Sequence, residues 1–279
     1  MFLHLLTFSS VQRQMYQAIQ VFSQQFPEFG YYWKFEMDFK YTGSHLSGLE
    51  LLSSWATAQP RKFLSERNAR FYLPKVHGDW GNYTAFVADS LKATETVWGP
   101  PNVQDINPVG PIPPTSRPED DTSNWGIGEP ADLITFMPQI DIRDTSLVFI
   151  DDLGGFTSNA NLPRRAAPVF ITRCSHLLLS AMHTANLAGQ WVSSEMTPET
   201  FSLLHGLKSV YVPHPVYMDG PWGAEELDKR FNSGRPVNAG GGGMSVYNMG
   251  TINHRVFHRL TYWWEARYAK EVWEELRDR

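Results

Sequence analysis

The sequence predicts an α/β fold, with short strands and helices alternating along the 279 residues of the chain. Two patterns support this prediction. Residues 11–26 place apolar side chains three and four positions apart, which is typical of a helix with one buried face. Residues 31–43 alternate apolar with charged side chains, which is typical of a strand with one apolar face. The length suits one large domain or two small ones, and we expect a single domain over residues 1–279.

Breaking residues mark the ends of the elements in the first half of the chain. Pro27 and Gly30 end the first helix before the strand begins. Further helices are expected at about 45–58 and 84–97. Residues 99–126 contain seven prolines and few large apolar residues, so we expect a loop or insertion there. In the strand, Trp33, Phe35, Met37, Phe39 and Tyr41 share one side, and the other side has Lys34, Glu36, Asp38 and Lys40.

The second half contains further strand and helix signals. A helix is expected to follow the strand at 168–172 and to end at about residue 187. Another begins at Thr197, where a hydroxyl, a proline and an acid form a good helix start. Gly206 suits the end of that helix. The glycine run 240–243 is expected to be flexible, and a C-terminal helix is expected from about residue 253. Short apolar runs predict strands at 133–136, 146–153, 168–172 and 208–212.

The composition excludes several classes of protein. The net charge is −5 and the isoelectric point is about 6.0, so the chain lacks the basic field that nucleic-acid binding requires. The one cysteine, Cys174, excludes an internal disulfide and is expected to be a small buried apolar residue. No stretch has the roughly 20 apolar residues of a membrane-spanning helix. A glycosylation sequon at 82–84 gives weak support for a secretory route.

Glu36 and Asp38 form the first candidate site. Residues two apart on a strand share a face, so these carboxylates can bind one hard cation such as Mg²⁺ or Mn²⁺. The alternative is that they are the polar side of a half-buried strand. His214 follows the strand at 208–212, and its imidazole either completes the metal site or forms a hydrogen bond in the core. We favour it over His205, which precedes that strand and lies at the opposite edge if the strands are parallel.

Other residues are candidates for catalysis or binding. Glu195, just before a helix start, is either a general base or an acid that complements the helix dipole. Lys208 is either a phosphate-binding ammonium or a surface charge. His205 is either a metal ligand or an imidazole that favours a helix end. The sequence contains no Walker or Rossmann glycine loop, no nucleophile elbow and no His-Glu-x-x-His motif.

The run YWKFEMDFKYTG at 32–43 resembles the Trp-x-x-Glu-x-Asp-x-Arg-Tyr-Thr-Gly signature of a large fungal family, domain of unknown function 3405. The likeness extends over nearly the whole chain. Lys40 stands where the signature has arginine, and the histidine that usually follows Thr-Gly is displaced to His45. The other segments that look like this family are QPRK at 59–62, ERNARFY at 66–72, ADLI at 131–134, SEM at 194–196 and HGLKSVYVPHPVY at 205–217.

The same strand is similar, more distantly, to the Tyr-Trp-Arg-x-Glu-Pro-Asp strand of yeast Golgi mannosyltransferases, which have the GT-A fold. This resemblance implies a GT-A-like three-layer α/β/α sandwich, in which acids after a central strand bind Mn²⁺ on a sugar nucleotide. Only about 30 residues precede the motif here. The strand-helix-strand unit that grips the nucleotide in GT-A domains is longer, so the resemblance implies a domain that lacks part of this N-terminal unit.

Together with this resemblance, the residues suggest a metal-dependent glycosyltransferase that moves a sugar from a nucleotide diphosphate to a hydroxyl of a glycan or other acceptor. A divalent cation, Mn²⁺ or Mg²⁺, would be bound by Glu36, Asp38 and His214 and would assist the departing diphosphate. Glu195 would be the base of an inverting reaction, whereas a retaining reaction needs none. Lys208 would neutralise the diphosphate. Substrate contacts are expected from Trp33, Arg61, Arg67 and Lys208.

The alternative function is a non-catalytic remnant or a carbohydrate-binding module of the same fold. It predicts neither metal binding nor turnover of a sugar nucleotide. A full-length form with an N-terminal anchor would place the protein in the Golgi or another secretory lumen.

Overall fold

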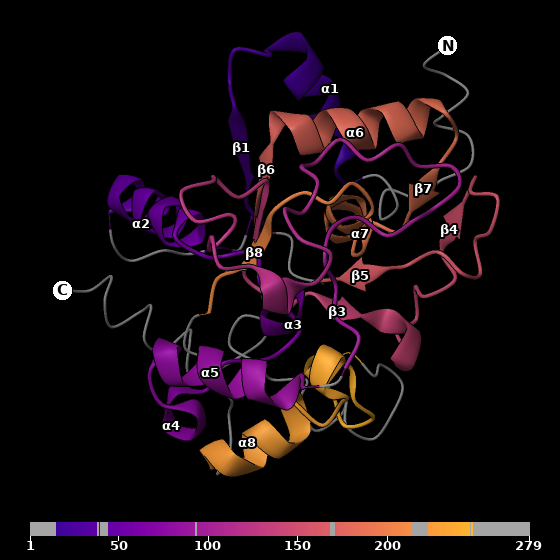
Figure 1. Cartoon of the computed structure of the whole chain (residues 1–279). Helices are drawn as coiled ribbons and strands as arrows, with labels where there is room; N and C mark the ends of the chain where they lie inside the picture. Colours follow the sequence, from indigo (N-terminus) through magenta and orange to yellow (C-terminus); the bar gives the residue numbers. More distant parts are fainter. Residues whose placement is uncertain are drawn as a thin grey trace.

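The computed structural model describes residues 15–37, 39, 44–92, 94–167, 171–213, 223–245 and 247. Within these residues the chain has a mixed α/β structure, as the sequence predicts. Short strands lie in the middle of the molecule, with helices packed around them (Figure 1). No helix in this part of the chain is long and apolar enough to cross a membrane.

The main sheet has four short strands in the order β1, β6, β2, β8. β6 is antiparallel to both of its neighbours, and β2 and β8 are parallel. β1, β2 and β8 therefore run in the same direction, and they end at one edge of the sheet, which we call the carboxyl edge. The opposite edge is the amino edge. The strands are β1 (Tyr31–Lys34), β2 (Leu133–Thr135), β6 (Thr172–Ser175) and β8 (Ser209–Tyr211).

Helices surround this sheet, and two small sheets extend it. Figure 1 shows α4, α5 and α8 grouped together at one end of the molecule, away from α1 and α6. The α-helices are α1 (Gln17–Gln25), α2 (His45–Thr57), α3 (Leu64–Asn68), α4 (Pro74–His77), α5 (Trp80–Ser90), α6 (His176–Leu187), α7 (Thr197–Leu204) and α8 (Ala224–Phe231). The 3-10 helices are η3 (Pro118–Asp120), η4 (Ile142–Asp144) and η5 (Pro236–Gly241). The small sheets pair β3 (Ile140–Asp141) with β5 (Arg165–Ala166) and β4 (Leu153–Gly154) with β7 (Trp191–Val192).

Different helices cover the two faces of the main sheet. Side chains at the same level of neighbouring strands point the same way, and successive residues alternate. Leu133 and Cys174 are level and point towards α1, α6 and α7, a side that we call the α6 face. Ile134 and Val210 are level and point towards α2, a side that we call the α2 face.

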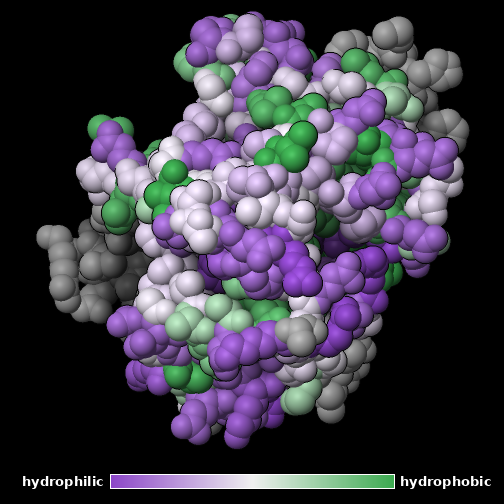
Figure 2. All heavy atoms as spheres, viewed as in Figure 1, coloured by the Kyte–Doolittle hydropathy of each residue, from purple (hydrophilic) through white to green (hydrophobic). Residues whose placement is uncertain are grey.

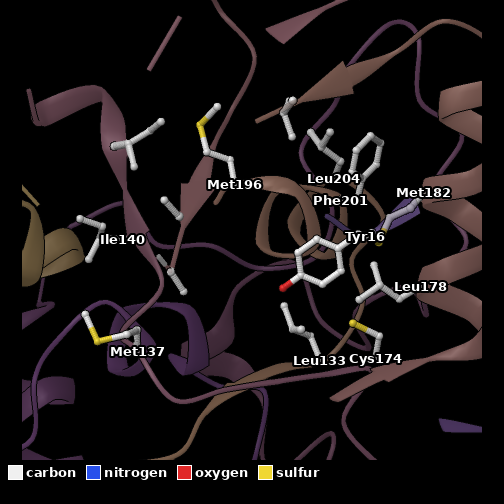
Figure 3. Packing of buried hydrophobic residues seen from close by; sticks show 14 of the residues in the cluster. Tyr16, Leu133, Met137, Ile140, Cys174, Leu178, Met182, Met196, Phe201 and Leu204 are labelled. Atoms are coloured by element: carbon white, nitrogen blue, oxygen red, sulfur yellow. The ribbon is translucent and has the colours of Figure 1, made fainter. Parts of the chain in front are cut away.

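The largest core lies on the α6 face. Leu133, Cys174, Leu178 and Phe201 are all fully buried there, and Figure 3 shows Tyr16 among them. Each fully buried leucine or phenylalanine stabilises the fold by roughly 1.5–3 kcal/mol, so this core is a major source of stability. Cys174 is buried, as its sequence context predicts. On the surface in Figure 2, polar residues predominate and apolar residues form separate small groups.

Three predicted elements differ from the structure for local reasons. The strand expected over residues 31–43 ends at Lys34, and Glu36 lies in a turn, since its carbonyl accepts a hydrogen bond of 3.1 Å from the Phe39 N–H. The helix expected at 84–97 starts earlier, at Trp80, because the Asp79 carboxylate accepts a hydrogen bond from the Asn82 N–H and caps it. The apolar run expected as a strand at 146–153 forms turns, with the Ile150 N–H bonded to the Leu147 carbonyl, until β4 begins. Residues 168–170 and the helix expected from residue 253 lie outside the described residues.

The glycine run was expected to be flexible, but its first residues are packed. Gly240 and Gly241 lie in η5 and are buried. The Gly240 N–H donates to the Ala69 carbonyl, and a Cβ atom at Gly240 would come within 2.9 Å of the Ile140 side chain. These glycines therefore let η5 approach α3 and β3 closely.

Candidate active site

The end of β1 places charged side chains on the α6 face at the carboxyl edge. Lys34 is the last residue of β1 and is level with Thr172 at the start of β6. Its ammonium lies 5.4 Å from the centre of the Tyr16 ring, and the Tyr16 hydroxyl lies 3.3 Å from the Thr172 Oγ1. Burial lowers the pKa of Lys34, and the negative charge of nearby Glu36 acts in the opposite direction.

Glu195 lies within electrostatic range of Glu36. It follows β7 and precedes α7, and its carbonyl accepts a hydrogen bond of 3.2 Å from the Ala167 N–H. Burial raises the pKa of Glu195 to about 7, and repulsion by Glu36 adds to the shift. Its Oε2 is buried and has no hydrogen-bond partner in the described part of the chain. A carboxyl group with this pKa can take up a proton near neutral pH.

Glu199 is a third acid in this region. It lies in the first turn of α7 and is only 2% exposed. Neither carboxyl oxygen has a hydrogen-bond partner among the described residues. Burial raises the pKa of Glu199 well above its ordinary value, and the charge of Glu195 raises it further. We call Glu36, Glu195 and Glu199 the acid cluster.

The sequence analysis did not select Glu199 or Tyr16. An acid in the first turn of a helix usually complements the helix dipole, and Glu199 fits that pattern. The available signal was the spacing of Glu195 and Glu199, since residues four apart near a helix start share a side. Burial raises the pKa of Tyr16, and the charge of Glu199 contributes, so this hydroxyl belongs to the same electrostatic environment.

The predicted metal site lies only partly within the described residues. Glu36 is described, whereas Asp38 and His214 are not. Across the described ranges, no group of three histidine, cysteine, aspartate or glutamate side chains is arranged to bind a metal ion. β1 and β8 are the two outer strands of the main sheet, about 14 Å apart at a spacing of roughly 4.8 Å per strand. An ion shared by Glu36 and His214 therefore requires the segments after these strands to approach each other across β6 and β2.

His205 lies at the amino edge. It is the C-cap residue of α7, and Gly206 follows with a φ of 65°, the left-handed conformation expected at a helix end. The His205 carbonyl accepts a hydrogen bond of 2.8 Å from the Gly110 N–H, and its ring stacks on Phe201. β8 runs in the same direction as β1, so His205 lies at the opposite edge from Glu36, as the sequence analysis argued.

Lys208 lies at the opposite edge of the sheet from Glu36, although it lines the same cavity as Glu199. It precedes β8, is level with Tyr31 in β1, and points to the α2 face. Lys34, at the far end of β1, is three residues from Tyr31, about 10 Å at 3.4 Å per residue, and Glu36 lies beyond it. The Lys208 ammonium is fully buried and donates to three main-chain carbonyls, those of Thr57 at 3.1 Å, Gly126 at 2.6 Å and Glu129 at 2.7 Å. Burial lowers its pKa to about 8.

The two arginines predicted to bind substrate make internal contacts. Arg61 forms two hydrogen bonds with the Glu129 carboxylate, at 2.8 and 2.6 Å, and a third with the Gly206 carbonyl. Arg67 donates to the carbonyls of Lys62 and Pro60, and burial lowers its pKa to about 10.

Trp33 also lies apart from the acids. It is half-buried on the α2 face and stacks on Phe35, with ring centres 5.8 Å apart. Of the predicted site residues in the described part, Glu36 and Glu195 lie within electrostatic range of each other, and Arg61 and Lys208 line one cavity at the amino edge.

Comparison with known proteins gives a family but no activity. A family model described as a protein of unknown function, DUF3405, matches residues 3–277. Neither the curated proteins nor the solved structures contain a match to the chain. Because the family model covers almost the whole sequence, the chain belongs to the DUF3405 family.

Proposed function

We propose that this protein transfers a sugar from a nucleotide diphosphate donor to a hydroxyl group of an acceptor, on a GT-A-like domain. The observation that supports the proposal best is that the Glu195 Oε2 is buried without a hydrogen-bond partner among the described residues, within electrostatic range of Glu36. These acids come from distant parts of the chain, and the pKa of Glu195, about 7, suits a general base at neutral pH. The helices on both faces of the sheet and the shared direction of β1, β2 and β8 are compatible with such a domain.

In this reaction Glu195 removes the proton from the acceptor hydroxyl. The hydroxyl oxygen forms a bond with the anomeric carbon of the donor sugar, and the bond from that carbon to the diphosphate breaks. The electron pair leaves with the diphosphate, and the proton remains on Glu195. Because the oxygen attacks opposite the leaving group, the configuration at the anomeric carbon is inverted. Glu36 contributes by repulsion, which raises the proton affinity of Glu195.

The divalent cation stays a separate proposal. Of its predicted ligands, Glu36, Asp38 and His214, only Glu36 is described, and the described residues alone do not form a complete donor set. The step above is therefore derived from the side chains of the chain alone. We propose no substrate contact for Arg61, Arg67 or Lys208, because the Arg61 and Lys208 donors and both terminal nitrogens of Arg67 are bonded to carbonyls or to Glu129.

The same internal contacts favour a second candidate function, a non-catalytic protein of the same fold. Arg61 and Lys208 were the residues expected to bind a diphosphate, and their side chains are instead enclosed at the amino edge. A non-catalytic protein needs neither a base nor a free cation. The two functions differ in whether a sugar nucleotide is consumed.

The test is a donor screen with variants of the acid cluster. Purified protein is incubated with UDP-, GDP- and dTDP-sugars, with and without Mn²⁺, and release of the nucleoside diphosphate is measured. We expect release with at least one donor, and a loss of about 100-fold or more in Glu195→Gln, as for removal of a general base. Glu50→Gln, an exposed glutamate of α2, is the matched control and should retain full activity. No release with any donor supports the non-catalytic alternative.

The cation proposal has its own measurement. Mn²⁺ is titrated into the wild-type protein and into Asp38→Ala, and the heat of binding is recorded. Binding by the wild type and not by the variant supports an ion at Asp38. Equal binding by both proteins, or binding by neither, would remove the cation from the proposal.

A further inference from the structure

β1 is an outer strand of the main sheet, and its free edge carries backbone groups without partners. On its other side β1 pairs with β6. The His176 N–H donates to the Gly30 carbonyl at 2.9 Å, so the bonded pairs with β6 continue at every second residue, beginning with Tyr32. The N–H and C=O groups of Tyr31 and Trp33 therefore point away from β6. Within the described part of the chain, neither residue forms a hydrogen bond through these groups.

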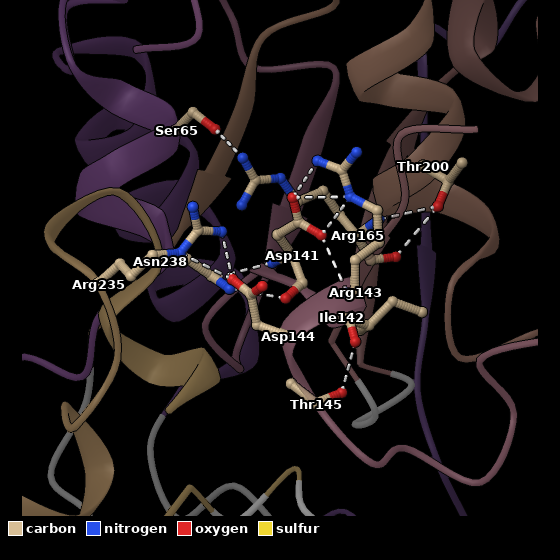
Figure 4. Close-up of polar contacts among 10 residues, drawn as sticks. All are labelled: Ser65, Asp141, Ile142, Arg143, Asp144, Thr145, Arg165, Thr200, Arg235 and Asn238. Atoms are coloured by element: carbon tan, nitrogen blue, oxygen red, sulfur yellow. Dashed lines mark hydrogen bonds and ion pairs between the residues drawn. The ribbon is translucent and has the colours of Figure 1, made fainter. Parts of the chain in front are cut away.

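Strand edges elsewhere in the molecule are covered by asparagine side chains. Asn238 donates to the Asp141 carbonyl of β3 at 2.7 Å and accepts from the Asp141 N–H at 2.8 Å (Figure 4). Asn68 bonds in the same way to Ser209 and Tyr211 at the outer edge of β8. No described residue does this for β1. The strand also contains no proline, and its one lysine stands at the last position, so it lacks the features that usually keep a strand edge from pairing.

Exposed aromatic side chains lie on both sides of this edge. On the α6 face, the ring centres of Phe22 and Phe29 lie 6.0 and 6.3 Å from that of Tyr32. On the α2 face, Trp33 stacks on Phe35. The aromatic residues here that are between 39% and 51% exposed are Phe22, Phe26, Phe29, Tyr31 and Phe35. At about 200 Å² per aromatic side chain they leave roughly 400 Å² of apolar surface, and patches of this size often mark interaction sites.

This surface has the size and the chemistry of one side of a protein interface. A stable interface buries about 800 Å² on each partner, and the aromatic side chains supply about half of this area. The strand backbone and its neighbours, among them the fully exposed Met37, supply more. A free strand edge between apolar flanks is suited to pairing with another edge of the same kind. The described chain provides one such edge, which is β1 itself, so the matching partner is a second copy.

We propose that two copies of this chain associate through β1, paired antiparallel about a two-fold axis at Tyr32. Tyr31 of one copy then lies opposite Trp33 of the other, and the outward N–H and C=O groups of these residues bond to each other. The two main sheets join into one continuous sheet. Tyr31 and Trp33 share the α2 face, so their rings meet as cross-strand aromatic pairs, which stabilise paired strands. The inference does not depend on the transfer reaction.

The charged residues near β1 are of both signs. Lys34 is the one charged residue of the strand, and Glu28 and Glu36 flank it. Lys34 lies within electrostatic range of Glu36 in the same copy. In the antiparallel arrangement it is level with Gly30 of the second copy, two residues from Glu28 of that copy. Each ammonium therefore lies near acids of both copies, which offsets the repulsion between those acids.

The first test is the oligomeric state of the purified chain, measured by analytical ultracentrifugation over a wide range of protein concentration. We expect a reversible equilibrium between monomer and dimer. Phe29→Glu places a charge in the aromatic surface and should weaken the dimer about tenfold or more. Phe86→Glu is the matched control, because Phe86 is 47% exposed and lies on α5, at the other end of the molecule (Figure 1). This variant should dimerise as the wild type does.

The second test identifies the strand by amide hydrogen exchange of the wild-type protein at low and high concentration. The amides of Tyr31 and Trp33 should become protected as the concentration rises. The Tyr32 amide is bonded to β6 in each copy, so it should be protected throughout and is the internal reference. This measurement needs no variant, so it decides the proposal even if Phe29→Glu does not fold.

Four results would overturn the proposal. The chain could stay monomeric at every concentration, or it could dimerise while the Tyr31 and Trp33 amides stay unprotected. Folded Phe29→Glu could dimerise as tightly as Phe86→Glu. Protection of both amides that does not change with concentration would show that another segment of the same chain, and not a second copy, pairs with β1.

Discussion

Two buried cations and two buried acids differ in their hydrogen bonding. Arg67 and Lys208 donate to main-chain carbonyls, so each has a clear structural role. Glu195 and Glu199 have buried carboxyl oxygens that no donor reaches within the described residues. Such acids tend to keep their protons, and functional sites are where shifted pKa values of this kind concentrate. The acid cluster is therefore the part of the molecule most suited to proton transfer.

The shifted pKa of Glu195 makes stability depend on pH. Its pKa is raised from the ordinary 4.5 to about 7 in the folded protein, so the folded state binds more protons between these pH values. The free energy of unfolding should therefore fall as pH rises from about 4.5 to about 7. We expect Glu195 to contribute a fall on the order of 1–3 kcal/mol, since the group is partly solvated. Urea unfolding at several pH values measures it.

Glu195→Gln should flatten this part of the pH profile, because a glutamine has no proton to lose. The exposed variant Glu50→Gln should keep the wild-type slope. Some slope should remain in Glu195→Gln, since the pKa of Glu199 is raised in the same direction. Identical profiles for the wild type and Glu195→Gln would show that Glu195 titrates normally.

The site residues show what sequence position can and cannot predict. Glu36 follows β1 at the carboxyl edge, within electrostatic range of Glu195, and its role in a site there stays a prediction. Lys208 precedes β8, so it lies at the amino edge, and this separation was available from the sequence once the strand was assigned. The burial of Glu199 could not be predicted from the sequence, because the polar residues of α7 are enclosed by segments that are distant in the chain.

At the scale of elements, asparagine side chains form hydrogen bonds with backbone N–H and C=O groups of distant segments. The Asn68 amide donates to the Ser209 carbonyl at 2.8 Å and accepts from the Tyr211 N–H at 3.0 Å. It therefore covers the outer edge of β8 as a neighbouring strand would. Asn232 pairs in the same way with Phe71, and Asn238 with Asp141. The sequence predicts β8 itself, but these partners are far away in the chain and no local pattern identifies them.

Removing the Asn68 amide should destabilise the protein. Asn68→Ala leaves a donor and an acceptor of β8 without partners, at about 1–3 kcal/mol each, so we expect a loss of about 2–4 kcal/mol. Asn68→Asp keeps the acceptor for the Tyr211 N–H but loses the donor to Ser209, so it should also be less stable than the wild type. Chemical unfolding measures both variants, with exposed Asn82→Ala as control. A loss no larger than that of the control would mean that the edge of β8 does not depend on Asn68.

At the scale of the whole molecule, a long irregular segment is bound to the sheet by buried polar groups. Residues 94–130 contain one short 3-10 helix, η3, as the proline content suggests. The Val97 N–H donates to the Glu66 carboxylate at 2.7 Å, and Lys208 binds the carbonyls of Gly126 and Glu129. The sequence predicts this loop but not how it is attached, because its partners are far away in the chain: Lys208 is 82 residues from Gly126.

Lys208 should therefore be essential for the arrangement of this segment. Its ammonium joins the end of α2, the segment at 126–129 and the start of β8 through three carbonyls. Lys208→Met keeps the aliphatic chain but leaves these buried carbonyls without a donor. We expect a loss of stability on the order of 3–5 kcal/mol, since each unpaired buried group costs about 1–3 kcal/mol and some relax towards water. Chemical unfolding and amide hydrogen exchange measure the loss and its location.

The control is Lys92→Met, which removes the same charge from a side chain that is 79% exposed. It should change stability by less than about 1 kcal/mol, as surface ion pairs usually do. In Lys208→Met, exchange should rise most at residues 124–130 and at the C-terminal end of α2, where the lost bonds were made. If Lys208→Met is as stable as Lys92→Met, or if its exchange rises uniformly, the ammonium does not attach this segment to the sheet. A role for Lys208 at the substrate would then become the better explanation of its burial.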